Sequence, residues 1–231
     1  MHTTLPRPAL HAPPDRSSTS QAGALLSSEA LSTLINLAGR QRMLSQRIVL
    51  QAELAAQGDT LARSRLGDGL KLMADTHRQL AHGTPELPAP FSESLKAAYF
   101  GVGQGQQRIT HFLDLAQRVY NGLTAIRPGQ TPPELPPLIE LSSPILTLLH
   151  DITQLYESEA RQLALKEKRA RHTLIEEIQR VAREAKIVAF NAIVAANRAG
   201  PQGREFGVVA ERMGSVTAEV DRLAQQALSG A

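Results

Sequence analysis

The chain of 231 residues contains no cysteine and no tryptophan, and only three tyrosines and five phenylalanines. Without cysteine it can form neither a disulfide framework nor a thiolate metal site, and this composition suits a reducing compartment. So few aromatic rings leave no stacking platform for single-stranded nucleic acid. The net charge is only +3 and is evenly spread, which is too weak to indicate nucleic-acid binding. We therefore expect no nucleic-acid partner.

Long hydrophobic runs are also missing. No stretch of 18 apolar residues occurs, so we expect no membrane span. Residues 1–23 contain several prolines and a Ser/Thr cluster, but no apolar region of the kind found in a secretory signal. We expect residues 1–25 to form a disordered tail and the protein to be soluble and cytoplasmic.

Motifs for catalysis and metal binding are absent as well. The seven histidines never form an i, i+4 pair with a carboxylate between them, and no P-loop, nucleophile motif or dinucleotide fingerprint occurs. His111 and Asp114 are spaced i, i+3, which is more often a surface pair than a metal site. We therefore predict a protein that is not an enzyme and that has no cofactor and no metal site.

The sequence does contain strong helical periodicity, with no sustained strand-like alternation. Four helices are expected, at about residues 27–58, 59–82, 92–126 and from 138 onwards. The first has Ser27 or Ser28 as its N-cap. Residues 101–105, Gly-Val-Gly-Gln-Gly, form helix poorly and predict a kink or a close-packing point in the third helix. The predicted fold class is all-α, with an antiparallel four-helix bundle.

The fourth helix is expected to be long, because residues 145–199 contain neither proline nor glycine. Its second half carries an apolar seam in strict 3-4 spacing: Leu174, Ile178, Val181, Ala185, Val188, Ala192, Ala195 and Ala199. After Gly200-Pro201-Gln202-Gly203 a second seam follows: Phe206, Val209, Met213, Val216, Val220, Leu223 and Ala227. We predict that these seams pair in an antiparallel coiled-coil hairpin. The predicted domains are the tail at 1–25, the bundle at 26–172 and the hairpin at 173–231.

Three arginines, Arg40, Arg42 and Arg47, interrupt an otherwise apolar stretch of the first helix. One apolar stripe there has the rhythm of a packed seam and includes Arg42: Leu31, Ile35, Ala38, Arg42, Ser45, Val49 and Ala52. If a second copy covers this stripe, two Arg42 side chains meet near the two-fold axis and repel one another. A small planar anion between them would accept bidentate hydrogen bonds from both. The alternative is that Arg42 reaches solvent and only its stem packs.

Residues 36–47, Asn-Leu-Ala-Gly-Arg-Gln-Arg-Met-Leu-Ser-Gln-Arg, resemble the signature helix of PilJ-type, or NarX-like, sensor domains. These are four-helix bundles at the front of chemoreceptors and of nitrate/nitrite sensor kinases. In the family, the arginine of a Gly-x-x-Arg-Met context binds nitrate or nitrite across a dimer interface. The resemblance therefore implies a ligand site made of Arg42, Gly39, Met43, Arg40 and Ser45.

The predicted hairpin tip, residues 191–211, resembles the cytoplasmic tip of methyl-accepting chemotaxis proteins. In that family the tip contacts a coupling protein and a histidine kinase, and it packs receptor dimers into trimers. The resemblance implies partner-binding roles for Asn191, Arg198, Gly200, Gly203, Arg204, Phe206 and Val209. The sequence departs from the family at Ala195 and Glu205, where Glu and Gly are usual, and both departures bear on trimer packing and kinase contact.

Together these observations predict a homodimeric signalling sensor. Its bundle would bind a small anion, nitrate or nitrite, and its hairpin would present the signal to a chemotaxis coupling protein, a kinase or a chemoreceptor. The alternative hypothesis is an adaptor without a ligand, in which the bundle dimerises and the hairpin joins or caps receptors.

Overall fold

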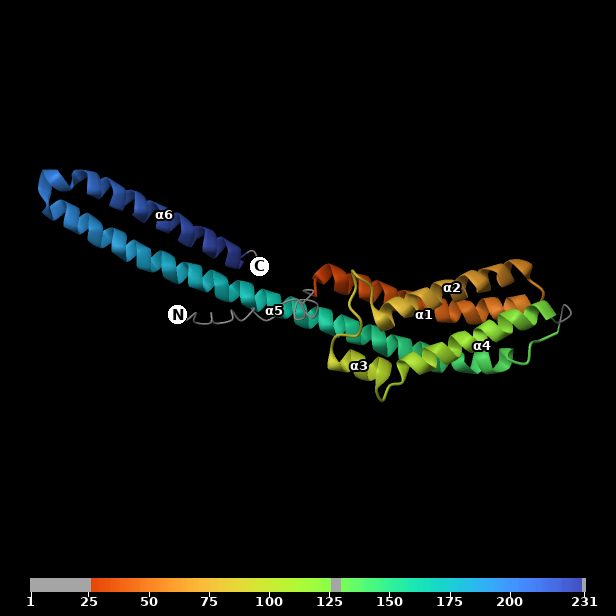
Figure 1. The fold of residues 1–231 in the computed structure, drawn as a ribbon. Helices are drawn as coiled ribbons and strands as arrows, with labels where there is room; N and C mark the ends of the chain where they lie inside the picture. The colour runs from red at the N-terminus through yellow and green to blue at the C-terminus, as the bar shows by residue number, and fades with distance from the viewer. Residues whose placement is uncertain (1–25, 126–129, 230–231) are drawn as a thin grey trace, which may run out of the picture. The chain divides into compact units, whose positions relative to one another are not determined.

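The computed structural model describes residues 26–125 and 130–229, and in these ranges it contains helices but no strand (Figure 1). In chain order the elements are α1 (Ser28–Ala56), α2 (Thr60–His82), α3 (Glu93–Phe100), α4 (Gly105–Ala125), α5 (Leu135–Arg198), the 3₁₀ helix η1 (Gly200–Gly203) and α6 (Arg204–Ser229). The predicted all-α class is confirmed. The predicted tail at residues 1–25 lies outside the described residues.

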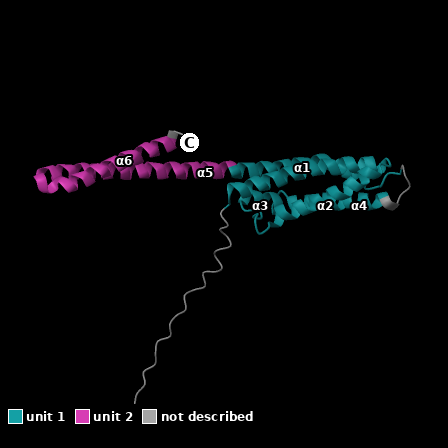
Figure 2. Cartoon of the chain, turned by 90° about the horizontal axis from the view of Figure 1, so that it is seen from above, with its two compact units in different colours: residues 1–160 teal, residues 161–231 magenta. Residues whose placement is uncertain are grey.

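The chain divides into two compact units that meet within α5, between Ala160 and Arg161 (Figure 2). The first unit holds α1 to α4 and the beginning of α5, and the second holds the rest of α5, η1 and α6. The sequence predicted the boundary between residues 172 and 173. Because α5 is helical across both positions, no change in local structure marks either of them.

Side-chain caps define the starts of α1 and α2. The Ser27 hydroxyl accepts a hydrogen bond from the backbone N–H of Ala30 at 3.0 Å. The Asp59 carboxylate accepts two N–H groups from the first turn of α2, at 2.8 and 2.9 Å. These bonds satisfy donors that have no partner inside the helix. Both helix starts agree with the sequence prediction.

The third predicted helix is interrupted, because residues 101–104 separate α3 from α4. A Cβ atom at Gly103 or Gly105 would lie only 2.7 or 2.6 Å from the carbonyl oxygen of Ala98, and Gln104 adopts a φ of +49°. The chain turns back so closely on α3 that only glycine fits. The prediction of one helix over 92–126 is therefore wrong, although the predicted irregularity at 101–105 is confirmed.

In the first unit, α1, α2, α4 and the beginning of α5 run alternately up and down and lie side by side (Figures 1 and 2). Hydrogen bonds join α1 to α5, since Gln46 Nε2 donates to Ser142 O at 3.2 Å and Ser142 Oγ donates to Gln46 Oε1 at 3.1 Å. The core is built from almost fully buried apolar side chains: Leu34, Leu44, Ile48, Leu66, Met73, Leu80, Ile109, Phe112, Val119, Leu138, Leu149 and Ile152. Each such side chain contributes roughly 1.5–3 kcal/mol by its burial.

In the second unit, α5 and α6 form the predicted antiparallel hairpin, and η1 lies at the predicted turn. Buried residues recur at every seventh position through the hairpin: Ile175, Ala182, Ala189 and Ala196 on α5, Gly203 in η1, and Ala210, Thr217 and Ala224 on α6. Most of these side chains are small, so the two helix backbones approach one another closely.

The predicted pairing of the two large apolar seams is wrong. Their members Leu174, Val181, Val188, Val209, Val216 and Leu223 each remain 51–63% exposed. The arms instead meet one position further along each helix, where smaller residues allow closer contact.

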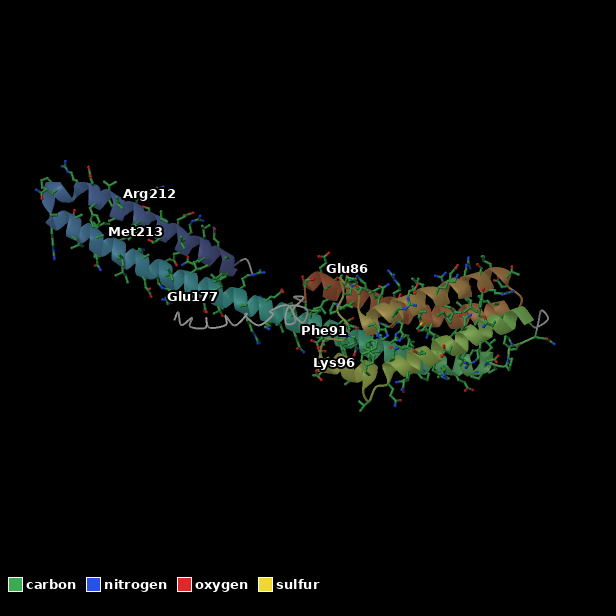
Figure 3. The ribbon with its side chains drawn as sticks, viewed as in Figure 1. Glu86, Phe91, Lys96, Glu177, Arg212 and Met213 are labelled. Carbon is green, nitrogen blue, oxygen red and sulfur yellow. The ribbon has the colours of Figure 1, made fainter. Side chains whose placement is uncertain are left out.

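Because the arms are antiparallel, the displaced residues share one side of the hairpin. We call this side the apolar face; it consists of Leu174, Ile178, Val181, Val188, Val209, Met213, Val216, Val220 and Leu223, and Figure 3 labels Met213 on α6.

His77 of α2 is buried inside the bundle. It is 6% exposed, and its ring stacks on that of Tyr99 with the centroids 6.4 Å apart. Burial disfavours the charged imidazolium and lowers the pKa of His77 from 6.5 to about 4. The Gln106 side chain acts in the opposite direction on this pKa, and His82 adds to the lowering. His77 is therefore neutral near pH 7.

Acidification should destabilise the bundle through His77. Between pH 6.5 and about 4, His77 is protonated in the unfolded chain but stays neutral in the folded chain. The free energy of unfolding therefore falls as the pH falls. The difference in pKa corresponds to roughly 3 kcal/mol. We expect denaturant titrations to show this loss in the wild type and a smaller loss in His77→Gln. His111 is exposed, and the His111→Gln variant is the control, which should lose as much stability on acidification as the wild type. An equal loss of stability in His77→Gln and the wild type would contradict the prediction.

Gly203 should be essential for the close approach of the hairpin arms. A Cβ at Gly203 would overlap the carbonyl oxygen of Ala196, whereas a Cβ at Gly214 meets no atom within 4 Å. We expect Gly203→Ala to destabilise the protein by about 1–3 kcal/mol through overpacking. The matched control Gly214→Ala should stabilise it by up to about 1 kcal/mol, because alanine favours helix. Thermal unfolding followed by circular dichroism distinguishes the two, and equal effects would show that the arms do not meet at Gly203.

Candidate functional site

The exposed side of α1 is positively charged and partly apolar. It carries Asn36, Arg40, Met43, Arg47 and Leu50, of which Met43 is 56% and Leu50 51% exposed. The sequence contains no acidic residue between Glu29 and Glu53. No described residue forms an ion pair with any of the three arginines of this helix. The positive charge on this surface is therefore not neutralised by the described part of the chain.

Arg42 lies at the edge of this surface and is half-buried. Its Nε atom is buried and has no hydrogen-bond partner in the described residues. Gln46, one turn further along the same face, bonds to α5, so this face of α1 is turned partly toward the neighbouring helix. An arginine that only extends into solvent keeps its donors hydrated, but the Nε of Arg42 is withdrawn from water. A guanidinium held in this way can offer its remaining donors to a planar acceptor.

Three of the other predicted ligand residues lie close to Arg42 on the helix surface. Gly39 and Met43 flank Arg42 at i−3 and i+1, and Arg40 lies on the exposed side. A Cβ at Gly39 would meet no atom within 4 Å, so the surface beside this turn is open. A ligand or a second helix could approach the backbone there.

Ser45 is placed differently from the other predicted ligand residues. It is 0% exposed, and its hydroxyl donates to the backbone oxygen of Arg42 at 2.8 Å. The side chain therefore supports the helix turn that carries Arg42 and does not reach the exposed surface. Its small size also allows close packing inside the bundle.

The predicted seam for a second copy is mostly buried within the monomer. Its members Leu31, Ala38, Ser45, Val49 and Ala52 pack inside the bundle, while Ile35 and Arg42 are half-buried. This prediction is wrong because α1 packs against more than one neighbouring helix of the same chain and buries a wide sector of its circumference. The surface that remains for another molecule is the exposed side with Arg40, Met43 and Arg47.

Sequence reasoning missed Gln41 as a buried residue. It is 0% exposed, and neither its Nε2 nor its Oε1 has a hydrogen-bond partner in the described structure. The signal was present in the sequence, because Gln41 stands three residues before Leu44 and seven after Leu34, in line with a buried apolar stripe.

The predicted partner-binding residues lie around the hairpin tip. Six of them are exposed: Asn191, Arg198, Gly200, Arg204, Phe206 and Val209. The seventh, Gly203, is buried against α5 and shapes the turn. Phe206 and Val209 are 57% and 63% exposed. This combination of exposed apolar and basic groups can contact another protein.

Within the described residues, no helix is both long enough and apolar enough to cross a membrane. No described group of three or more His, Cys, Asp or Glu side chains is arranged to hold a metal ion.

Comparison with known proteins gives one result for the N-terminal part of the chain. Residues 24–122 match the family model PilJ, described as the N-terminal part of type IV pili methyl-accepting chemotaxis transducers. No curated protein and no solved structure matches the chain. The matched residues include α1, α2, α3 and most of α4, and with them the arginine-containing surface. Residues 24–122 therefore resemble the N-terminal part of these transducers, which indicates a role in chemotaxis signal transduction.

Proposed function

We propose that the protein is a homodimeric sensor that binds a small planar oxyanion, nitrate or nitrite, at Arg42. The observation that carries this proposal is the half-buried Arg42, whose Nε has no partner, on a helix surface with three arginines and no acidic neighbour in sequence. A planar anion would supply the missing acceptor atoms. The PilJ match is consistent with a sensing role for this domain.

The chemistry of the guanidinium favours an oxyanion of this kind. Arginine presents its donors in a planar fork that fits two oxygen atoms of one ligand. Arg42 cannot lose its proton, so two copies brought together at a two-fold axis would repel one another. A shared anion would remove this repulsion and link the two copies. The open surface at Gly39 leaves room for their approach.

The apolar face of the hairpin supports the dimer. Leu174, Val181 and Val188 on α5 and Val209, Val216 and Leu223 on α6 are all more than half exposed. A contiguous apolar surface of this kind is typical of an interaction site. A second hairpin carries the same surface, so the two copies can cover each other in an isologous contact.

Helix α5 provides a physical connection between the two parts of the proposed mechanism. It begins in the bundle and continues without interruption to Arg198, next to the hairpin turn. A shift or rotation of this helix, caused by anion binding, would therefore be transmitted along a stiff element. We propose that the hairpin tip passes the signal to a chemotaxis coupling protein, a kinase or a receptor.

An adaptor without a ligand is the second candidate function. The observation that favours it is the exposure of Phe206, Val208 and Val209 near the tip, at 57%, 67% and 63%. In this case the hairpin binds receptors or a coupling protein, and the arginines of α1 serve only the contact between subunits.

Replacing Arg42 should abolish anion binding. Isothermal titration calorimetry with sodium nitrate and sodium nitrite should give saturable binding for the wild type. Hydrogen bonds to charged groups contribute about 1.5–3 kcal/mol, so Arg42→Ala should bind at least about tenfold more weakly. Arg65→Ala removes the same charge from the exposed side of α2, outside the arginine-containing surface of α1, and should bind nearly as well as the wild type.

Two outcomes would contradict the anion assignment. Equal binding by the wild type and Arg42→Ala would rule out Arg42 as the ligand residue. A melting temperature that does not respond to any anion of a panel, together with recovery of a purified receptor or coupling protein, would favour the adaptor.

A charge placed on the apolar face should weaken the dimer. Val216→Glu would bury a carboxylate at the proposed contact, which is strongly unfavourable without a partner. Analytical ultracentrifugation should show a dimeric wild type and a dissociation constant raised by roughly tenfold or more in the variant. Ala218→Glu adds the same charge on the other side of α6 and should remain dimeric. A monomeric wild type, or dimers of equal strength in both variants, would exclude this surface as the contact.

A further inference from the structure

A layer of polar side chains crosses the core of the bundle. It consists of Gln41 on α1, His77 on α2, Tyr99 on α3, Gln106 on α4 and Tyr156 on α5. Gln41, Tyr99 and Tyr156 are 0% exposed, and His77 is 6% exposed. Each of the five helices that enter the first unit contributes one member to this layer.

Four members of this polar layer are linked by direct evidence of proximity. The ring of His77 stacks on that of Tyr99, and the side chain of Gln106 influences the pKa of His77. Tyr99 and Tyr156 influence each other's pKa, and burial is the main cause that raises both values. These side chains therefore lie around one place in the core, between α2, α3, α4 and α5.

Gln41 joins the polar layer through the register of α1 and α2. A Cβ at Gly69 would lie 3.4 Å from the Ile48 side chain, so these two positions face one another. Gln41 lies seven residues before Ile48 on α1, and His77 lies eight residues after Gly69 on α2. Because the two helices are antiparallel, Gln41 and His77 are displaced in the same direction and lie at the same level of the bundle.

The polar layer contains seven buried atoms without a hydrogen-bond partner. These are Nε2 and Oε1 of Gln41, both ring nitrogens of His77, the hydroxyls of Tyr99 and Tyr156, and Oε1 of Gln106. Elsewhere in the described chain only Arg42 Nε and Gln51 Oε1 share this condition, so the unsatisfied groups are concentrated here. Buried polar groups of native proteins are almost always hydrogen-bonded. His77 with Gln106, and Tyr99 with Tyr156, lie near enough to act on each other's pKa as hydrogen-bonding groups, but neither pair forms a bond of ordinary geometry. The polar layer therefore leaves part of its hydrogen-bonding capacity unmet, which is costly in a buried site.

The chemistry of the polar layer favours a small neutral partner. The two hydroxyls and the imidazole can each donate and accept, the Gln41 amide offers two N–H donors and a carbonyl acceptor, and Gln106 offers an acceptor. His77 is neutral at pH 7, so no member carries a charge that would hold an anion or a cation. Water is small, neutral and amphoteric, and buried water typically makes about three hydrogen bonds to such groups.

We propose that the polar layer is an internal water site, in which ordered water molecules bridge Gln41, His77, Tyr99, Gln106 and Tyr156. The bridges join all five helices of the first unit at one level. Gln41 directly precedes Arg42, so the water site lies on the inner side of the helix turn that carries the candidate anion site. The proposal rests on the buried groups alone and does not depend on the anion assignment.

Tyrosine-to-phenylalanine variants test whether the buried hydroxyls have partners. Tyr99→Phe and Tyr156→Phe each remove one hydroxyl from the layer, and Tyr120→Phe is the control because Tyr120 lies outside it. We expect each of the first two to lower the melting temperature by about 2–4 °C, and the control to change it less. The double variant should lose less than the sum, because the hydroxyls share the bridging water. A raised or unchanged melting temperature in both single variants would show that the hydroxyls are unpaired and would overturn the proposal.

A direct bond between the two tyrosine hydroxyls would also lower the melting temperature, so a second measurement detects the water itself. Magnetisation transfer from long-lived water to the ring protons of Tyr99 and Tyr156 should appear in NMR spectra of the wild type. In the double phenylalanine variant the transfer to the rings at these two positions should weaken, because the water loses two of its hydrogen-bond partners. If the wild type shows no such transfer, the water site is excluded, whatever the melting temperatures are.

Discussion

The close approach of helix backbones at small residues is the constraint on which both units of this protein depend. In the hairpin, Gly203 lies directly against the carbonyl group of Ala196, and buried residues, most of them small, recur at seven-residue intervals toward the ends of the arms. In the bundle, Gly103 and Gly105 turn the chain back onto Ala98. Such contacts gain dispersion energy only when the two surfaces fit closely, so they determine where the larger side chains go. In the bundle the larger side chains are covered by other helices, whereas in the hairpin they form an exposed apolar face.

One turn of α1 carries a buried polar group on its inner side and charged groups on its outer side, and these two sets of groups interact with different kinds of partner. On the inner side, Gln41 belongs to a neutral layer whose seven buried atoms need partners. On the outer side, Arg42 and its neighbouring arginines carry charge that the described chain leaves unpaired. The inner groups can be satisfied by neutral molecules, because the burial of a charge without compensation is far more costly. The outer groups lie at the surface, where they can interact with water, an anion or a negatively charged surface. One helix turn thus combines an uncharged core layer with a positively charged surface.

The residues that match the PilJ family model end earlier in the chain than the first compact unit does. The match ends at residue 122, within α4, but the bundle is completed by the beginning of α5 up to Ala160. The same helix then provides the first arm of the hairpin. No loop separates the bundle from the hairpin, because α5 is a single helix from Leu135 to Arg198.

Much of the local structure was predictable from the sequence by itself, because helix starts and turns depend on residues close together in the chain. Ser27, Asp59 and the Gly200–Gly203 turn act through local hydrogen bonds and backbone geometry. The sequence also identified Arg42 as a candidate ligand residue, because a permanent charge stands there in an otherwise apolar helix. Only the tertiary structure decided which apolar stripe faces inward. In the hairpin, the series that contains Val181 and the series that contains Ala182 both satisfy helical spacing, and the smaller series is buried because it allows closer packing against the opposite arm. His77, Tyr99 and Tyr156 are far apart in sequence and meet only in the folded bundle, since their contact depends on how separate helices pack and not on local periodicity.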